Sequence, residues 1–501
     1  MTVRNLWLGF IASALCAGLA IAVADSAPAH ADTLESALAA VYGSNPTINA
    51  ERARLRATDE ELAKAQSGYR PQIGFDADLG EASLASSVKP PGLASGLAPT
   101  PAQIQQNEAA FKRYDGLTRP GGFAVTLSQP LFEGFQTVNS VKQADASIMA
   151  ARESLRDVEQ KTLLDTIKTY MDVLRDAANM ALRQHSLKLL TSEANATQER
   201  FAEGEMTRTD VSQARAREAE AKAALEGAKA NLRASLANYQ RLVGHVPVRL
   251  TNPVGFEQLL PARIEDAIAA AISRNPQVVG AAYLEKAAAF DVNKTLGEML
   301  PQVRLQATHS ERFDPSTLLY QQTNESASVR VNIPIYQAGD VEARVRQAKQ
   351  QHQGRIQEIE GAREQARATA ISAFAQVQAM RAQVAAIRMQ VQATTDGLSG
   401  VREEQKAGQR TLLDVLNAEQ EQTNARVSAV QARHDLVIAS YTLLSAMGRL
   451  SAADLGLGVQ LYDAQDHYAE TNGKWAGVSV DHEPAYAGEN RGWGPAVETQ
   501  R

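Results

Sequence analysis

Two aspartates, each in a turn that follows a glycine, are the residues of this sequence with the clearest capacity for chemistry. The stretch "GEMTRTDVSQARA" begins at Gly204 and "GQRTLLDVLNAEQ" begins at Gly408, and both place a threonine, an aspartate and a valine at matched distances after the glycine. The carboxylates of Asp210 and Asp414 can attract cations or accept charge-assisted hydrogen bonds. The glycines let a chain reverse between antiparallel helices with a positive φ. Thr209 and Asp210 also suit a helix N-cap, which is the purely structural interpretation.

The rest of the chain offers no pattern typical of an enzyme. Its 8 histidines are scattered singly, and the sequence contains no H-E-x-x-H, no G-x-S-x-G and no phosphate-binding glycine loop. We therefore predict no catalytic residue, no cofactor and no metal site. The formal net charge of -6 and the lack of a long basic block argue against nucleic acid as a partner.

The first 31 residues are typical of a signal peptide. Arg4 supplies the positive start, "LWLGFIASALCAGLAIAV" the apolar stretch, and "AHA" a cleavage site of the small-x-small type. An uncleaved membrane anchor is the alternative. The single cysteine, Cys16, lies in the apolar stretch, so the mature chain is expected to carry neither disulfides nor thiols. Beyond residue 31 no run of roughly 18 apolar residues occurs, so we expect no transmembrane helix.

The mature chain is predicted to consist of two copies of one unit. Pro130 in "SQPLFEGF" corresponds to Pro334 in "NIPIYQAG", an offset of 334 − 130 = 204 that also relates Gly204 to Gly408. Further upstream, "RPQIGF" corresponds to "LPQVRL" with an offset of 301 − 71 = 230. The difference coincides with "SSVKPPGLASGLAPTPAQIQQ", a Pro/Gly/Ser-rich loop of the first copy. We assign residues 32–262 to the first repeat and 263–462 to the second.

Each repeat shows the same order of expected elements. A helix with an Asn-Pro interruption comes first, two strands follow, and a long helix then reverses at the glycine turn into a return helix. The expected helices span 34–66, 138–201 and 209–242 in the first repeat, and 264–299, 341–406 and 412–447 in the second. At 1.5 Å per residue the long helices would extend about 100 Å. Apolar residues three and four apart, with many alanines, predict coiled-coil packing.

Four segments alternate apolar and polar residues, as strands with one apolar face do. In "QIGFDADL", Ile73 and Phe75 alternate with Asp76 and Asp78, and "FAVTLSQPLF" and two segments of the second repeat, 303–308 and 328–333, follow the same rule. One interpretation is a small sheet that covers a soluble core. The other is a membrane β-barrel, but a barrel needs about eight strands, so several chains would have to contribute to it.

Together these features resemble the TolC family of bacterial outer-membrane export ducts. The resemblance spans residues 34 to about 461 and is carried by the duplicated unit, the "NP" and "PQ" pairs, "SQPLFEGF", "NIPIYQAG" and the turns "FAEGEMTRTDVSQA" and "KAGQRTLLDVLNAEQ". It implies a mainly α fold with a small β part, in which long coiled-coil helices are combined with four strands per chain. Three chains would form a 12-stranded β-barrel (4 × 3 = 12) on an α-helical tunnel, in the outer membrane of a Gram-negative bacterium with a long periplasmic part.

The resemblance also implies that the helix turns close the tunnel. Three copies of Asp414 would form a ring of carboxylates that attracts cations. Arg410 would link to Thr209 and Asp210 of the neighbouring hairpin and hold the mouth shut. Some family members carry a second acidic residue one turn later, where this chain has Asn417. The ring is therefore expected to carry less charge.

The expected partners follow from the same resemblance. A periplasmic adaptor would dock at the turns of Gly204 and Gly408, and an inner-membrane transporter would complete a tripartite export system set in outer-membrane lipid. The exported material, proteins of type I secretion, drugs or both, is left open by the sequence. A periplasmic adaptor of the same machinery is the alternative function. Residues 463–501 are expected to form a disordered tail.

Overall fold

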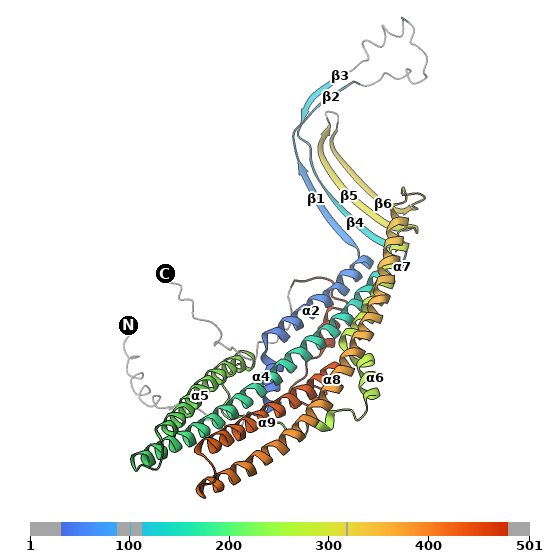
Figure 1. The fold of residues 1–501 in the computed structure, drawn as a ribbon. Helices are drawn as coiled ribbons and strands as arrows, with labels where there is room; N and C mark the ends of the chain where they lie inside the picture. Colours follow the sequence, from blue (N-terminus) through green and yellow to red (C-terminus); the bar gives the residue numbers. More distant parts are fainter. Residues whose placement is uncertain (1–31, 88–100, 102–112, 317–318, 479–501) are drawn as a thin grey trace, which may run out of the picture.

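The computed structural model describes residues 32–87, 101, 113–316 and 319–478. The predicted signal peptide and most of the Pro/Gly/Ser-rich loop lie outside the described residues. The long helices run side by side as an elongated bundle, and the strands extend from one end of it (Figure 1). None of the helices in the described part of the chain has the length and apolar character that a membrane crossing requires.

Each repeat begins with two helices that an Asn-Pro pair separates, as predicted. In the first repeat α1 (Leu34–Ser44) is followed by α2 (Pro46–Gln66), and in the second α6 (Ile264–Arg274) is followed by α7 (Pro276–Gly297). Asn45 caps α2 because its side-chain oxygen accepts a hydrogen bond from the backbone N–H of Thr47 at 2.8 Å. Asn275 does the same for Gln277 at 2.9 Å. The proline suits the first helical position because no donor is needed there.

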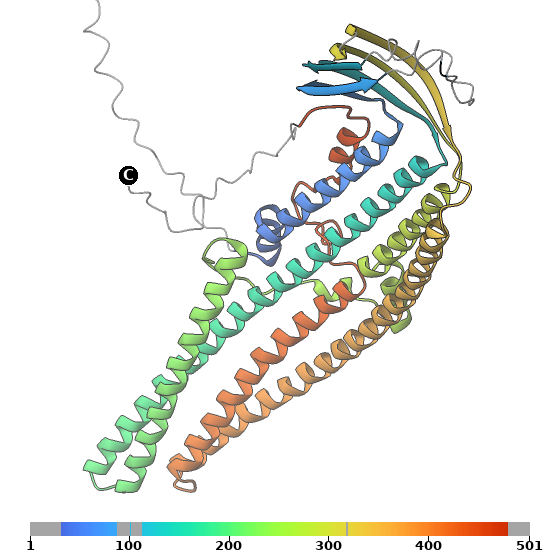
Figure 2. The same ribbon diagram turned by 90° about the horizontal axis from the view of Figure 1, so that it is seen from above.

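Two long hairpins form most of the bundle, with boundaries within a few residues of the prediction. The first pairs α4 (Gln136–Ala202) with α5 (Arg208–Val243), and the second pairs α8 (Asp340–Lys406) with α9 (Leu412–Ala446). Both α4 and α8 contain 67 residues, which corresponds to about 100 Å. The hairpins lie next to each other and turn at the same end of the molecule (Figure 2).

The long helices of the two repeats differ in burial. In the single chain α4 buries large side chains such as Leu163, Ile167 and Tyr170. By contrast, α8 buries only valines, alanines and one leucine: Val341, Val345, Ala348, Ala366, Ala370, Ala373, Val377 and Leu398. Most of the remaining surface of α8 is open to solvent.

The strands form a four-stranded antiparallel sheet and a separate two-stranded ribbon. The sheet has the order β1 (Gln72–Leu79), β4 (Gly121–Glu133), β5 (Gln302–Ser316) and β6 (Leu319–Asn332). The ribbon pairs β2 (Ala82–Ser87) with β3 (Arg113–Thr118). The prediction of four strands per chain is therefore confirmed for the sheet, but it omits the two strands of the ribbon. The ribbon escapes prediction because "ASLASS" and "RYDGLT" lack clear apolar alternation.

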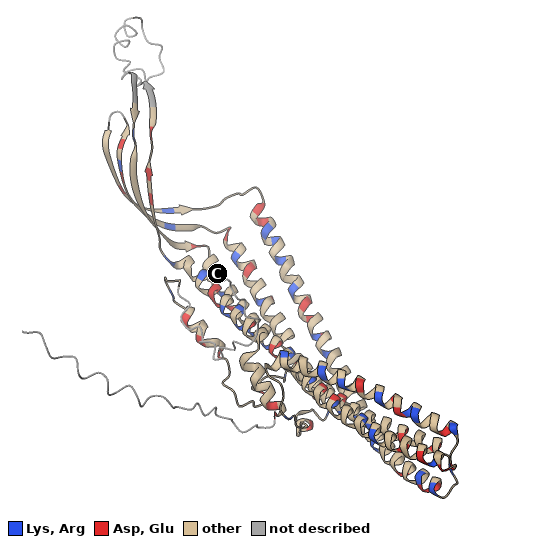
Figure 3. Ribbon diagram, turned by 90° about the vertical axis from the view of Figure 1, so that its left-hand side faces the viewer, with Lys and Arg blue, Asp and Glu red and all other residues tan. Residues whose placement is uncertain are grey.

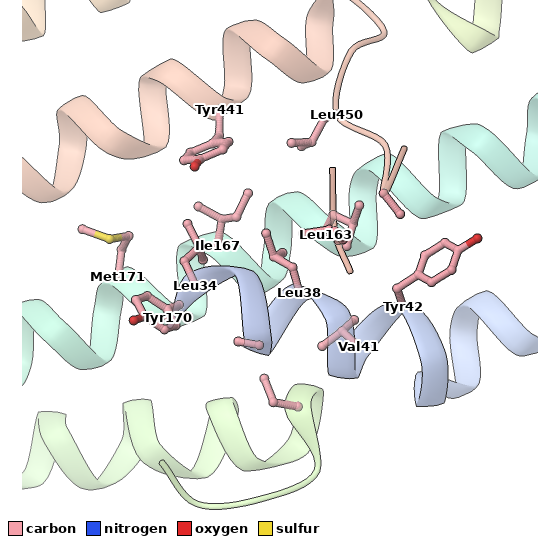
Figure 4. Close-up of a cluster of buried hydrophobic side chains, with 14 of the residues drawn as sticks. Leu34, Leu38, Val41, Tyr42, Leu163, Ile167, Tyr170, Met171, Tyr441 and Leu450 are labelled. Carbon is pink, nitrogen blue, oxygen red and sulfur yellow. The ribbon is translucent and has the colours of Figure 1, made fainter. Parts of the chain in front are cut away.

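A compact apolar core joins the repeats at the middle of the bundle. Side chains from α1, α4 and α9, including Leu38, Ile167 and Tyr441, point into a common space (Figure 4). Tyr170 is fully buried there, and its hydroxyl donates to the backbone oxygen of Thr251 at 2.7 Å and accepts from the N–H of Thr251 at 3.1 Å. The core thus ties the linker after α5, which contains a short 3₁₀ helix (Phe256–Leu259), to both repeats.

Two backbone segments lie in close contact where the sheet meets the helices. Gly134, between β4 and α4, has φ +61°, and a Cβ placed on it would lie 2.2 Å from the backbone oxygen of Gly297 at the end of α7. A side chain at position 134 would therefore clash, because the Gly297 carbonyl belongs to the backbone and cannot rotate away as a flexible side chain would. A second 3₁₀ helix (Ser67–Tyr69) joins α2 to β1.

The prediction of a disordered tail over residues 463–501 is wrong for its first part. Helix α10 (Ala464–Thr471) packs on α2, and Arg152 of α4 donates to its first residue, Ala464. The Nδ1 of His467 lies 3.1 Å from the buried carboxylate of Asp59, and the Tyr468 hydroxyl donates to Asp145 at 3.0 Å. These polar contacts are long-range in sequence, so local composition does not reveal them. Residues 479–501 lie outside the described part.

Candidate functional site at the hairpin tips

The two glycine turns lie side by side at the end of the bundle farthest from the sheet (Figures 1 and 2). Gly204 has φ +83° and Gly408 has φ +77°, and a Cβ on either residue would meet nothing within 4 Å. Glycine is therefore favoured at these positions by backbone conformation and not by space. Both turns are exposed, so they are open to a partner.

A capping box follows each turn and holds the aspartate. In the first hairpin the Thr207 hydroxyl donates to Oδ2 of Asp210 at 2.7 Å and accepts from the Asp210 N–H at 3.2 Å. In the second, Thr411 and Asp414 repeat this arrangement at 2.8 and 3.3 Å. The N-cap of α5 is thus Thr207, whereas Thr209, the predicted cap residue, lies exposed in the first turn of the helix. Asp210 fills the third helical position, as a capping box requires.

The caps keep both aspartates ionised. Hydrogen bonds from the Thr207 side chain and then its backbone N–H lower the pKa of Asp210 below its ordinary value. Thr411 lowers the pKa of Asp414 in the same order of causes. Each cap uses Oδ2 only, and Oδ1 of both aspartates accepts no hydrogen bond from the described part of the chain. One charged oxygen per aspartate is therefore free for a further partner.

Arg410 pairs within its own turn. Its Nε lies 2.7 Å from Oε2 of Glu404, and this hydrogen bond raises the pKa of Arg410. Within the described residues of one chain, Arg410 makes no hydrogen bond to Thr209 or Asp210. The structure of a single chain therefore does not bring these predicted partners together. Sequence reasoning missed Glu404 because the ion pair spans the turn, six residues apart.

Asn417 contacts the other hairpin. Its Oδ1 accepts a hydrogen bond from Nη2 of Arg217 on α5 at 3.0 Å. Sequence reasoning did not identify Arg217, although it lies seven residues after Asp210 and hence on nearly the same face of α5. Leu412 and Leu416 at the start of α9 are buried against the first hairpin, with Leu190, Ala194, Ala214 and Ala221. In the described part of the chain, an apolar cluster and one side-chain hydrogen bond thus join the start of α9 to the first hairpin.

The charge around the tips is mixed, since basic and acidic residues are interspersed along the helical bundle (Figure 3). Within the described residues, no group of three or more His, Cys, Asp or Glu side chains is arranged to hold a metal ion. The tips can therefore offer exposed carboxylates, a guanidinium and backbone turns to a partner.

The sheet is the second feature with a function to explain, because its apolar face is uncovered. The register places Ile73 beside Leu127, and Leu127 beside Ala307, so the apolar residues of β1, β4 and β5 share one face. Ile73 is 74% exposed and Phe75 is 68% exposed. The opposite face carries polar residues such as Asp76, and within the described residues β1 and β6 leave both edges of the four-stranded sheet without a partner strand.

Comparison with known proteins gives a consistent result. The family model described as "Outer membrane efflux protein" matches residues 37–245 and 267–449, which lie in the two repeats. The chain is 36% identical to the outer membrane efflux protein BepC of Brucella suis, over 90% of this chain and 92% of BepC. It is 25% identical to the alkaline protease secretion protein AprF of Pseudomonas aeruginosa, over 66% of this chain and 70% of AprF.

A solved structure shows the same fold. The CmeC outer membrane channel of Campylobacter jejuni superimposes with a TM-score of 0.69 at 15% sequence identity. The match covers 88% of this chain and 89% of CmeC.

Proposed function

Because this chain belongs to the TolC-type outer membrane efflux protein family and resides in the outer membrane with a periplasmic part, we propose that it is the trimeric exit duct of a tripartite export system. The observation that supports this most directly is the sheet, whose apolar face and both edges are open. An adaptor role does not explain such a sheet.

The direction of the strands suits closure by identical subunits. All neighbours in the sheet are antiparallel, so β1 and β5 run one way while β4 and β6 run the other. Around a rotation axis, the β6 edge of one chain therefore meets an antiparallel β1 edge of the next. Four strands are too few to close a barrel, whereas three chains supply 4 × 3 = 12, within the range of membrane barrels.

The internal repeat supports a particular register for this proposed joint. Strand β5 repeats β1 with an offset of 230, and β6 repeats β4 with an offset of 204. Within the chain Val125 of β4 lies opposite His309 of β5. If the joint between subunits copies this internal one, Val329 (125 + 204) lies opposite Leu79 (309 − 230) of the partner subunit.

Cysteine crosslinking tests this arrangement on a clean background, since Cys16 in the predicted signal peptide is the single cysteine. The full chain carrying Val329→Cys and Leu79→Cys, treated in membranes with a short bismaleimide, should give covalent dimers and trimers on a denaturing gel. The matched control pairs Val329→Cys with Phe75→Cys, which lies four residues, or about 13 Å, out of register. Monomers from both variants would refute the trimeric barrel.

The closed mouth forms the second part of the proposal. Three copies of Asp414 form a ring of carboxylates, and its free Oδ1 atoms attract cations. Arg410 exchanges Glu404 for Thr209 and Asp210 of the neighbouring hairpin, in charge-assisted hydrogen bonds that solvent weakens at this exposed site. Opening then requires these contacts to break when an inner-membrane transporter and its adaptor engage.

Single-channel recording in planar bilayers tests the gate. Asp414→Ala and Arg410→Ser should each raise the conductance, because each removes contacts that hold the mouth closed. Asp396→Ala is the matched control, since this carboxylate of α8 is bonded only to Gln392 on its own helix within the described residues. Conductance equal to that of the control would remove both residues from the gate.

The adaptor is proposed to dock at the turns of Gly204 and Gly408, where the backbone is exposed. The cargo is proposed to include proteins, drugs or both, because the relatives comprise an efflux protein and a protease secretion protein. Deletion of the chain, followed by assays of secreted proteins and of drug sensitivity, distinguishes these cargoes. If neither changes, the export role is wrong.

A further inference from the structure

Arg217 makes the one side-chain hydrogen bond between α5 and α9 in the described part of the chain. Its Nη2 donates to Oδ1 of Asn417 at 3.0 Å, while its Nη1 donates to Oε2 of Glu220, one turn further along α5, at 2.9 Å. Glu220 thereby fixes the orientation of the guanidinium group. The bond connects two residues that lie 200 positions apart and belong to different repeats.

The position of this bond places it just inside the predicted mouth. Arg217 lies two helical turns after Asp210, and Asn417 lies one turn after Asp414. Each therefore shares a helix face with the capping aspartate of its own hairpin. A movement that separates the two tips of one chain must pull Asn417 away from Arg217.

The apolar contact beneath the bond cannot set the relative position of the hairpins by itself. On the first hairpin it consists largely of alanines, against which Leu412 and Leu416 of α9 pack. Apolar packing of this kind is non-directional, so a small shift of α9 along α5 costs little. A hydrogen bond to a charged donor depends steeply on distance and angle. The Arg217–Asn417 bond is thus the element that specifies the register between the tips.

We propose that Arg217 is a second latch of the mouth, a positioning residue that acts through Asn417 to hold the two hairpins of one chain in the closed arrangement. The proposal rests on the gating role proposed above and adds to it a contact within each subunit. Asn417 then does more than reduce the charge of the ring, because it accepts the bond that closes the latch.

Single-channel conductance of the full-length protein in planar bilayers tests the latch. Arg217→Gln should increase the conductance, with the closed-to-open ratio falling about fivefold, as expected for the loss of one exposed hydrogen bond to a charged group. Arg215→Gln is the matched control. It removes a guanidinium two residues away that donates to Gln198 inside the same hairpin and not to α9.

A double-mutant cycle separates the latch from the ring charge. Asn417→Asp turns the hydrogen bond into an ion pair, so the conductance should fall below that of the wild type. Adding Arg217→Gln should abolish this fall. If Asn417→Asp lowers the conductance equally in the presence and absence of Arg217, ring charge accounts for the effect and the latch is refuted.

The failure of the latch can be told from the failure of the gate. If Asp414→Ala raises the conductance while Arg217→Gln behaves like Arg215→Gln, the gate stands and the latch is refuted. If no variant and no wild-type protein conducts, the proposed duct is wrong, and the latch falls with it.

Discussion

His434 is expected to give the fold a pH-dependent joint between the repeats. This residue of α9 is 7% exposed, and its Nε2 lies 2.9 Å from Oδ1 of Asp172 on α4 while its Nδ1 lies 2.8 Å from Oδ1 of Asp435. An imidazole can donate from both nitrogens only when it is protonated. Arg175 pairs with Asp172 at 2.9 Å and competes for the same carboxylate. Gln431 donates to Asp435.

The direction of the pH effect follows from the pKa of His434. Burial by itself would lower this pKa, but the hydrogen bonds to Asp172 and Asp435 outweigh burial, so the pKa lies above the ordinary 6.5. A raised pKa in the folded state means that the contribution to stability is fully present below pH 6.5 and is lost as the pH rises through the folded value. The pKa of Asp172 is lowered, so its contribution to stability changes with pH only below the ordinary value of 3.8, well outside the pH range in which His434 titrates.

The magnitude is modest because the carboxylates are partly in water. Two hydrogen bonds between charged groups could contribute about 1.5–3 kcal/mol each. The side chains of Asp172 and Asp435 are 37% and 36% exposed, however, and solvent screening reduces the total to about 1–2 kcal/mol. For a chain of this length that corresponds to roughly 2 °C in Tm.

Thermal unfolding followed by circular dichroism at pH 5.5 and pH 9 tests the joint. His434→Gln should lower the Tm by about 2 °C relative to the wild type at pH 5.5, and the difference should shrink at pH 9. His185→Gln serves as the control, since His185 is exposed on α4. An equal difference at both pH values would show that His434 carries no charge in the fold.

Three further predictions concern the turns and the sheet. Gly204→Ala should lower the free energy of unfolding by about 1–2 kcal/mol, because alanine is strained in the left-handed backbone conformation, and should still give folded protein. Gly134→Ala should greatly reduce the folded yield, because its Cβ would clash with the Gly297 backbone. The yield of protein solubilised from membranes measures both effects. Val125→Arg, on the apolar face in the middle of the sheet, where Val125 pairs with Phe75 and His309, should cost about 2–4 kcal/mol near the bilayer centre and deplete the outer-membrane fraction, whereas Thr126→Arg on the polar face should not. Thr411→Ala removes the cap of α9 and should destabilise its first turn by about 1 kcal/mol. It should also return the pKa of Asp414 toward 3.8. Hydrogen exchange of the first turn and an NMR titration of Asp414 measure these effects, and protection equal to that of the wild type would contradict the capping role.

Most of the helical framework is predictable from the sequence, because the signals that start and stop each helix are local. Asn45 and Asn275 precede prolines and cap α2 and α7, and the glycine turns delimit both hairpins. The strands of the sheet are predictable because their apolar alternation has period two. Helix α10 is not, since it is held by contacts such as His467 with Asp59, more than 400 residues away in sequence.

The candidate site is predictable only in part. The aspartates stand out because their spacing recurs in both repeats. The choice of Thr207 over Thr209 as cap depends on where the backbone first becomes helical, which is Arg208, one residue before the expected start. Arg217 and Glu404 escape notice because their partners lie across the hairpins or across a turn. Such pairings require knowledge of which helices are neighbours.

The bare side of α8 has a consequence for the life of the protein before assembly. A newly exported chain holds this helix of 67 residues against its own fold by a narrow seam of small side chains. In the trimer proposed above, neighbouring chains would cover this side of α8, so we expect the helix of a single chain to open locally at a lower free-energy cost than the same helix in the assembly.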